Sequence, residues 1–288
     1  GVKGKTQVNY DFQYGLSSPW RTREVLNASE YALMMNEGRI NAGQAPEYSD
    51  PYSYGVGTDW QKEVFNYNAP KQQHQLSVSG ASDKVNYFVS LGYNKEDGVV
   101  GGNFGRSNYE RLTLRSNTLY TLFDKTAERS WLNKMEIGAN LSYANIKSSG
   151  IDVNHTYGST LASALSLSPI LGVFADDATA ASYIDLYNYG VDEAGLPVYY
   201  GDRRVKNAAG RIYTIPGSAY NEMVNPVAQL SLPASKGWSH KFVGNFNAEL
   251  QIIDGLKFRS SFGTDLSFWG SDGYTPYFYL GSNNKADE

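Results

Sequence analysis

The chain has 288 residues and a formal net charge of −4, so it lacks the basic surface that nucleic-acid binding requires. It contains no cysteine, which excludes disulfides and thiolate metal sites. Its mean hydropathy is −0.45, and no run of about 18 apolar residues predicts a membrane-spanning helix. The 23 tyrosines and 29 glycines fit β-barrels with aromatic girdles, and also carbohydrate-binding β-proteins.

Alternation of apolar and polar residues predicts seven β-strands. From Val85 to Tyr93, for example, every second residue is apolar and those between are mostly polar. The predicted strands are Gln7–Tyr14, Gln72–Gly80, Lys84–Asn94, Tyr109–Leu122, Trp131–Asn145, Trp238–Ile252 and Leu256–Trp269. Most of them reach the roughly 9–11 residues that a tilted strand needs to cross a bilayer. Their length favours membrane strands over the shorter strands of an ordinary sandwich.

The connections between these strands alternate between short and long. Ala81–Asp83 and Ile253–Gly255 are tight turns, whereas residues 16–71 and 146–237 form long connections. Outer-membrane barrels have short periplasmic turns and long extracellular loops. The sequence therefore predicts an all-β, antiparallel transmembrane barrel segment over residues 1–288, in which 16–71 and 146–237 are extracellular.

Short helices are expected inside the long connections. Asn27 and Glu30 form a capping-box pattern, and Gly38 is the expected end of the helix that follows. A second helix is expected over Thr160–Leu167, ending before Pro169.

Several stretches of the chain resemble segments of a known family. They are GVKGKTQVNYDFQYG at the N-terminus, VLNASEYALMMNEG in the first long connection, the segment Gly57–Val100, and NPVAQL at Asn225–Leu230. The first resembles the junction of plug and barrel in SusC/RagA-type TonB-dependent outer-membrane transporters, and the second resembles the helix in their first extracellular loop. Gly57–Val100 is the most specific of these stretches, and the resemblance spans nearly the whole chain.

This resemblance implies a barrel of about 22 strands with a plugged lumen. It implies a location in the outer membrane of Bacteroidetes-type bacteria and import of oligosaccharides or, in some members, peptides. TonB would supply the energy, and a SusD-like surface lipoprotein would act as a lid. Because the plug, the TonB box and most of the strands have no counterpart in this sequence, no residue here can be assigned to TonB contact.

Charged residues fall on the polar side of several predicted strands and are candidates for lining the lumen. These residues are Asp11, Arg111, Arg115, Glu136, Glu249, Arg259 and Asp265. They would face plug or substrate, and the alternative is a solvated sheet face.

Aromatic residues near the strand ends are candidates for the two interfacial girdles. These residues are Tyr14, Tyr120, Trp131, Trp238 and Phe268. In the alternative, a soluble sandwich, the same side chains would belong to a core.

Tyrosines in the second long connection are candidates for contact with the lid or with a sugar. These residues are Tyr183, Tyr187, Tyr199, Tyr200, Tyr213 and Tyr220. Because tyrosine concentrates at protein interfaces, the lid is favoured slightly.

No catalytic, metal or cofactor site is expected, and the chain does not read as an enzyme. His74, His155 and His240 lack paired ligand spacing, and Asp176–Asp177 and Asp192–Glu193 lack the spacing of a known calcium loop. No nucleophile-elbow motif occurs. The alternative function is a secreted carbohydrate-binding β-protein, which would be soluble without detergent.

Overall fold

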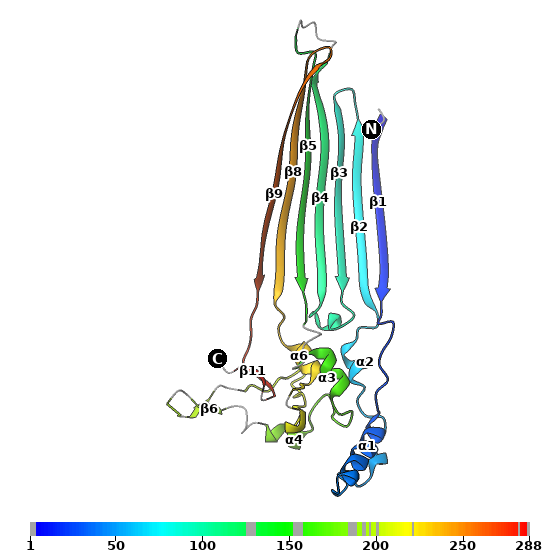
Figure 1. The fold of residues 1–288 in the computed structure, drawn as a ribbon, viewed down its shortest axis with the longest axis vertical. Coiled ribbons are helices and arrows are strands. Elements are labelled where there is room, and N and C mark those ends of the chain that lie inside the picture. Colours follow the sequence, from blue (N-terminus) through cyan, green and yellow to red (C-terminus); the bar gives the residue numbers. More distant parts are fainter. Residues whose placement is uncertain are drawn as a thin grey trace.

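A long antiparallel sheet stands on a lobe built from its own connections (Figure 1). The computed structural model describes residues 4–124, 131–151, 158–183, 189–191, 194–195, 197–199, 202–220, 222–281 and 283–286. The strands of the sheet, in spatial order, are β1 (Gly4–Ser17), β2 (Ala69–Ala81), β3 (Val85–Asp97), β4 (Asn108–Phe123), β5 (Lys134–Ser149), β8 (Lys236–Ile253) and β9 (Leu256–Asp272). All seven predicted strands are therefore confirmed, and each pairs with its neighbours in the chain.

The long connections gather at one end of the sheet, opposite the β2–β3 and β8–β9 turns (Figure 1). Backbone hydrogen bonds tie them together. The Thr58 amide donates to the Pro169 carbonyl at 2.8 Å, and the Gly101 amide donates to the Val64 carbonyl at 3.1 Å. The alternation of short and long connections thus predicted the arrangement correctly.

The lobe contains short helices and two small strand pairs. Its helices are α1 (Ala28–Asn41), α2 (Trp60–Val64), α3 (Thr160–Ser166), α4 (Asp177–Ser182) and α6 (Pro226–Ser231), with 3-10 turns η1 (Pro51–Tyr54), η2 (Gly102–Phe104) and η3 (Ser218–Tyr220). The small strands are β6 (Tyr189–Val191) with β7 (Pro197–Tyr199), and β10 (Phe278–Gly281) with β11 (Asn284–Ala286). The helix predicted over 160–167 is confirmed as α3.

Helix α1 begins as predicted and ends later than predicted. The Asn27 side chain accepts from the Glu30 amide at 2.9 Å, and the Glu30 carboxylate accepts from the Asn27 amide at 2.9 Å, which is a capping box. The helix passes through Gly38, so the predicted end at this residue is wrong. Arg39 secures the extra turn, because its side chain donates to the Ala45 carbonyl at 2.9 Å.

The lobe holds the main hydrophobic core of the described chain. Trp60, Val64, Leu167, Val224 and Leu230 are buried together there. The Trp60 indole donates to the Ser168 carbonyl at 3.1 Å, which satisfies its one polar group. Three connections and the β10 segment contribute to this core, so the lobe is a packed body.

Among the described residues, none of the helices has the length and apolar character to cross a bilayer.

Candidate transport surface on the polar face of the sheet

The strand register sorts the sheet residues onto two chemically different faces. Leu76 pairs with Leu91 and Leu91 with Leu114, so apolar side chains of neighbouring strands share one face. The residues expected on this apolar face are Val89, Leu91, Ile137, Leu141, Phe246 and Phe262. Their exposed fractions run from 39% to 67%. An apolar surface of this extent needs a cover that the described residues do not supply.

All seven charged residues singled out from the sequence lie on the opposite, polar face. Cross-strand pairing places Arg115, Ser142, Val243 and Asp265 in one row. Glu136, Glu249 and Arg259 form another row nearer the short turns. Asp11 lies opposite Gln75 on β2, and Arg111 opposite Asn94 on β3. Their common face is established by the register, while their contact with plug or substrate stays a prediction.

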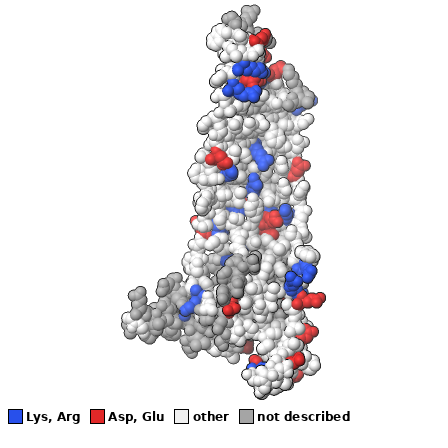
Figure 2. Space-filling view, in the orientation of Figure 1, with Lys and Arg blue, Asp and Glu red and all other residues white. Residues whose placement is uncertain are grey.

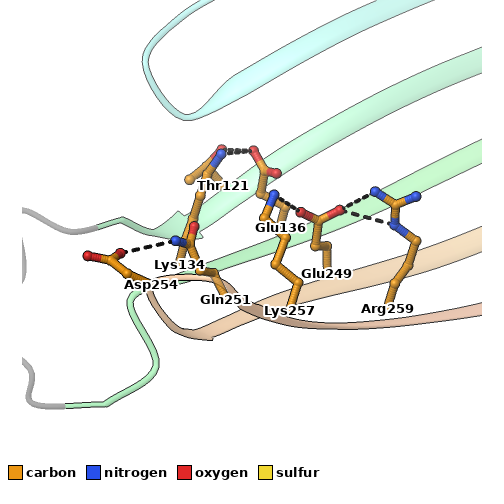
Figure 3. A network of polar contacts seen from close by, with 8 residues as sticks. All are labelled: Thr121, Lys134, Glu136, Glu249, Gln251, Asp254, Lys257 and Arg259. Atoms are coloured by element: carbon orange, nitrogen blue, oxygen red, sulfur yellow. Dashed lines mark hydrogen bonds and ion pairs between the residues drawn. The ribbon is translucent and has the colours of Figure 1, made fainter.

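A network of ion pairs occupies the short-turn end of the polar face (Figure 3). The Glu249 carboxylate accepts from Lys257 Nζ at 2.8 Å and from Arg259 Nη2 at 2.6 Å. Lys134 Nζ lies 2.8 Å from Glu136, which also accepts from the Thr121 hydroxyl at 3.2 Å. These contacts fix long side chains on neighbouring strands in one orientation.

Charges are sparse over the rest of the sheet. Figure 2 shows the charged side chains of the visible surface as separate small groups among uncharged residues. On the polar face, Lys71 pairs with Glu96 at 3.2 Å and Lys241 with Asp265 at 3.4 Å. Arg111 and Arg115 instead lie beside a groove that contains no acidic residue among its described lining.

Four of the five predicted girdle residues lie on the apolar face of a strand. Tyr14, Trp238 and Phe268 lie toward the long connections, and Tyr120 lies toward the short turns. Trp131 is in a bend before β5, so the predicted start of this strand at Trp131 is wrong. The backbone of Leu132 has φ of 62°, which is incompatible with an extended strand.

Two histidines that lie far apart in the sequence share one row of the apolar face. Pairing runs from His74 through Tyr93, Leu112 and Asn145 to His240. The Tyr10 hydroxyl lies 2.8 Å from His74 Nδ1, and the Tyr143 hydroxyl lies 2.8 Å from His240 Nδ1. Tyr–His pairs with apolar bodies and polar tips suit the depth at which hydrocarbon meets headgroups. Alternation alone places both histidines on the apolar face, but only the strand register shows that they share one row.

Trp269 is a further residue that the sequence pattern did not single out. It is 80% exposed and lies on the polar face near the long connections, opposite Ser239. The signal was present in the sequence, because Phe268 on the apolar face places its neighbour on the other face.

The loop tyrosines have different environments. Tyr183 and Tyr213 are only 7% and 6% exposed, and Tyr213 stacks on Phe174 with ring centroids 4.8 Å apart. These two side chains help to build the lobe, which corrects their selection as outward contacts for a lid or sugar. Tyr220 is half-buried. Tyr187 and Tyr200 lie outside the described residues, as does the side chain of Tyr199.

Two groups in the lobe have shifted pKa values. Burial and the hydrogen bond with Tyr31 raise the pKa of the Tyr220 hydroxyl well above its ordinary value. The side-chain hydrogen bonds from Arg204 and Lys206 hold the pKa of the Asp202 carboxyl well below its usual range. Tyr220 is therefore protonated and Asp202 charged at neutral pH. Among described residues, no group of three His, Asp or Glu side chains could hold a metal ion.

Known proteins share sequence and architecture with this chain. No family model matches the chain. It is 25% identical over 269 residues to the TonB-dependent receptor P3 of Formosa agariphila, with 91% of this chain and 21% of the relative covered. It is also 25% identical over 272 residues to the TonB-dependent receptor SusC of Bacteroides thetaiotaomicron, with 91% and 23% covered.

A structure of the RagAB peptide importer in its open-open state superposes with a TM-score of 0.61 and 17% identity, over 93% of this chain and 28% of that one. The closed-closed state gives a TM-score of 0.58 and 19% identity, with 93% and 29% covered.

This chain resembles one segment of a SusC/RagA-type TonB-dependent receptor. The resemblance and the barrel-segment fold expected from the sequence are thereby confirmed. These receptors are outer-membrane proteins, in agreement with the predicted location. The chain spans 21% to 23% of the length of these two curated relatives.

Proposed function

We propose that this chain forms a seven-stranded wall segment of an outer-membrane, TonB-dependent nutrient importer. The observation that supports it best is the division of the sheet into an exposed apolar face and a charged polar face. In a barrel, lipid covers the first face and the second lines the lumen. The rival, a secreted carbohydrate-binding protein, would have to leave this apolar face in water, since no described helix covers the middle of the sheet (Figure 1).

The polar face suits a hydrophilic cargo, either an oligosaccharide or a peptide. It presents amides, hydroxyls and charged groups at successive rows, as a barrel interior does. Exposed Trp269 adds an aromatic surface near the long connections, on which a sugar ring or a peptide side chain can pack. Movement of cargo would draw its energy from TonB, which would act through parts of the receptor outside this segment.

The long connections would face outward and meet a SusD-like lipoprotein lid. The first of them exposes large apolar side chains that the described chain does not cover. They include Trp20, which is 91% exposed, Tyr52 and Val56. Exposed apolar groups of this kind favour a partner interface, and they replace Tyr183 and Tyr213 as contact candidates.

Cysteine labelling of the full receptor in intact cells tests this orientation. In a cysteine-free receptor background that also lacks the lid lipoprotein, Ser53→Cys on η1 should react with a membrane-impermeant maleimide added outside. The matched variant Ser82→Cys, in the β2–β3 turn, should react only after the outer membrane is permeabilised. External labelling of Ser82→Cys with protection of Ser53→Cys would contradict the proposed topology.

Growth experiments test import itself. Cells that lack the receptor gene should lose growth on at least one polysaccharide or peptide source, and the intact gene should restore it. Loss of TonB should produce the same defect. Unchanged growth on every tested source would contradict the importer function.

A further inference from the structure

A groove of about 360 Å³ crosses strands β2, β3 and β4 on the polar face. Side chains of Gln73, Gln75, Ser90, Asn94, Arg111 and Arg115 surround it. Gly92 lies at its centre, opposite Gln75 on one side and Thr113 on the other. A residue with no side chain at this point leaves the hollow open.

Packing does not explain the glycine. A Cβ built at Gly92 would come no closer than 3.9 Å to the Thr113 side chain, so there is room for a larger residue. Its φ is outside the left-handed region, so the backbone conformation does not require glycine either. Glycine inside a strand often marks a bulge, a bend or the close approach of another group, and the pairing of Gly92 is regular with both neighbouring strands, which leaves close approach.

The groove is positively charged. Arg111 and Arg115 lie on the same side of β4, with their Cα atoms roughly 14 Å apart along the strand at about 3.4 Å per residue. Among the described residues neither forms an ion pair, and the Arg111 guanidinium donates only to the Thr113 hydroxyl, at 3.1 Å. Lys71, at the rim, is held by Glu96. Asp11 is on β1, two strands from Gly92, and does not line the groove.

The groove also contains an unused acceptor. Asn94 Oδ1 is buried and accepts no hydrogen bond from any described group. Asn94 pairs across the strands with Arg111, so this acceptor lies beside a guanidinium donor. A buried acceptor without a donor is costly, and a ligand O–H or N–H that displaced the side chain covering it would satisfy it.

We propose that this groove is a subsite for a carboxylate with an O–H or N–H donor close to it. Arg111 and Arg115 would bind the carboxylate through charge-assisted hydrogen bonds, for which guanidinium geometry is well suited. Asn94 would accept from the neighbouring donor. This proposal rests on the proposed importer function. The carboxylate would belong either to an acidic cargo or to the receptor's own segment that fills the lumen.

Matched charged and neutral probes test the subsite on the full receptor. The probes are tetragalacturonate with its methyl ester, and tetraglutamate with tetraglutamine, with binding measured by calorimetry. At least one acidic probe should bind wild-type receptor roughly tenfold more tightly than its neutral counterpart. The Arg111→Gln/Arg115→Gln variant should lose this preference. The control Lys257→Gln/Arg259→Gln removes the same charge from the short-turn end of the same face and should keep it.

A carboxylate supplied by the lumen-filling segment predicts a different result. If the carboxylate belongs to the lumen-filling segment, neither acidic probe is preferred. The Arg111/Arg115 variant then makes this segment more sensitive to protease than the Lys257/Arg259 control does. A receptor that supports growth, shows no preference for acidic probes and has unchanged protease sensitivity in the arginine variant would overturn the subsite alone. Reversed cysteine labelling would instead overturn the importer topology.

Discussion

The hydroxyl oxygens of Tyr31 and Tyr220 lie 2.6 Å apart, although 189 residues separate them in the chain. Tyr31 is on α1 in the first long connection, and Tyr220 is on η3 in the second long connection. Together with the Thr58–Pro169 bond, this contact makes the two connections one body. A rigid body at the mouth of a barrel presents a fixed surface to a partner, which lowers the entropic cost of binding.

Removing this hydroxyl pair should loosen α1. We expect Tyr220→Phe to cost about 1 kcal/mol of local stability, since a half-buried hydrogen bond contributes on that order. Trypsin should then cut the first connection about fivefold faster in the full receptor, by the free-energy change above. Tyr52→Phe removes an exposed hydroxyl on the same connection and is the control. Equal cutting rates for the two variants would show that the Tyr31–Tyr220 contact does not hold α1.

Gly57 should tolerate no side chain. Its φ is +70°, and a Cβ would lie 2.3 Å from the Pro169 carbonyl oxygen and 2.5 Å from Ala28 Cβ. Gly57→Ala should therefore destabilise the lobe by about 2–4 kcal/mol, which combines backbone strain with a forced separation of the connections. Gly43 has a φ of +72° with open space around it, so Gly43→Ala isolates the strain and should cost about 1 kcal/mol. Protease sensitivity of the full receptor measures both, and equal losses would contradict the steric account.

An added charge should destabilise the receptor far more on the apolar face of β5 than on its polar face. Leu141 lies mid-strand on the apolar face, and Asn140 precedes it on the polar face. Leu141→Arg should cost about 2–4 kcal/mol because it places a charge in hydrocarbon. Asn140→Arg should cost much less. Ile137, near the start of the strand, should give a smaller loss than Leu141 because the penalty falls toward the interface.

Unfolding of the full receptor in lipid vesicles by denaturant measures these costs. Equal destabilisation by Leu141→Arg and Asn140→Arg would mean that the facing assignment is wrong. A larger loss at Ile137 than at Leu141 would instead mean that the centre of the bilayer lies closer to the short turns than proposed.

Period-two alternation predicted the sheet well because each strand has one face that must be apolar. The same rule placed Arg111 and Asp265 on the polar face from the order of residues alone. It could not show that Arg111 and Arg115 share a groove with Asn94, because this depends on the register between β3 and β4. It also could not separate a buried from an exposed tyrosine in the lobe. Tyr213 is buried by tertiary packing against Phe174, and no local pattern in the sequence encodes that contact.

The carboxyl of Asp202 should make part of the lobe sensitive to acid. Arg204 donates to both of its oxygens, from Nε at 2.7 Å and from Nη2 at 2.8 Å, and Lys206 donates as well. Arg204 also donates to the Ala180 carbonyl at 3.3 Å, so the carboxylate helps to hold α4. Because these contacts lower the pKa of Asp202 in the folded lobe, the stabilisation is present above the unfolded value of about 4. It is lost as pH falls below 4 through the folded pKa.

Hydrogen exchange of α4 in the full receptor measures this effect. Asp202→Asn should exchange faster than wild type at pH 7, because the charge that orients Arg204 is gone. The difference should shrink below pH 4, because the carboxyl is then protonated in the unfolded lobe while it stays ionised in the folded one, so its stabilising contribution falls. Asp177→Asn is the control, because it removes a carboxylate on α4 that forms no ion pair among the described residues. A difference between Asp202→Asn and wild type that stays constant down to pH 2 would show that shape, and not charge, connects Asp202 to the helix.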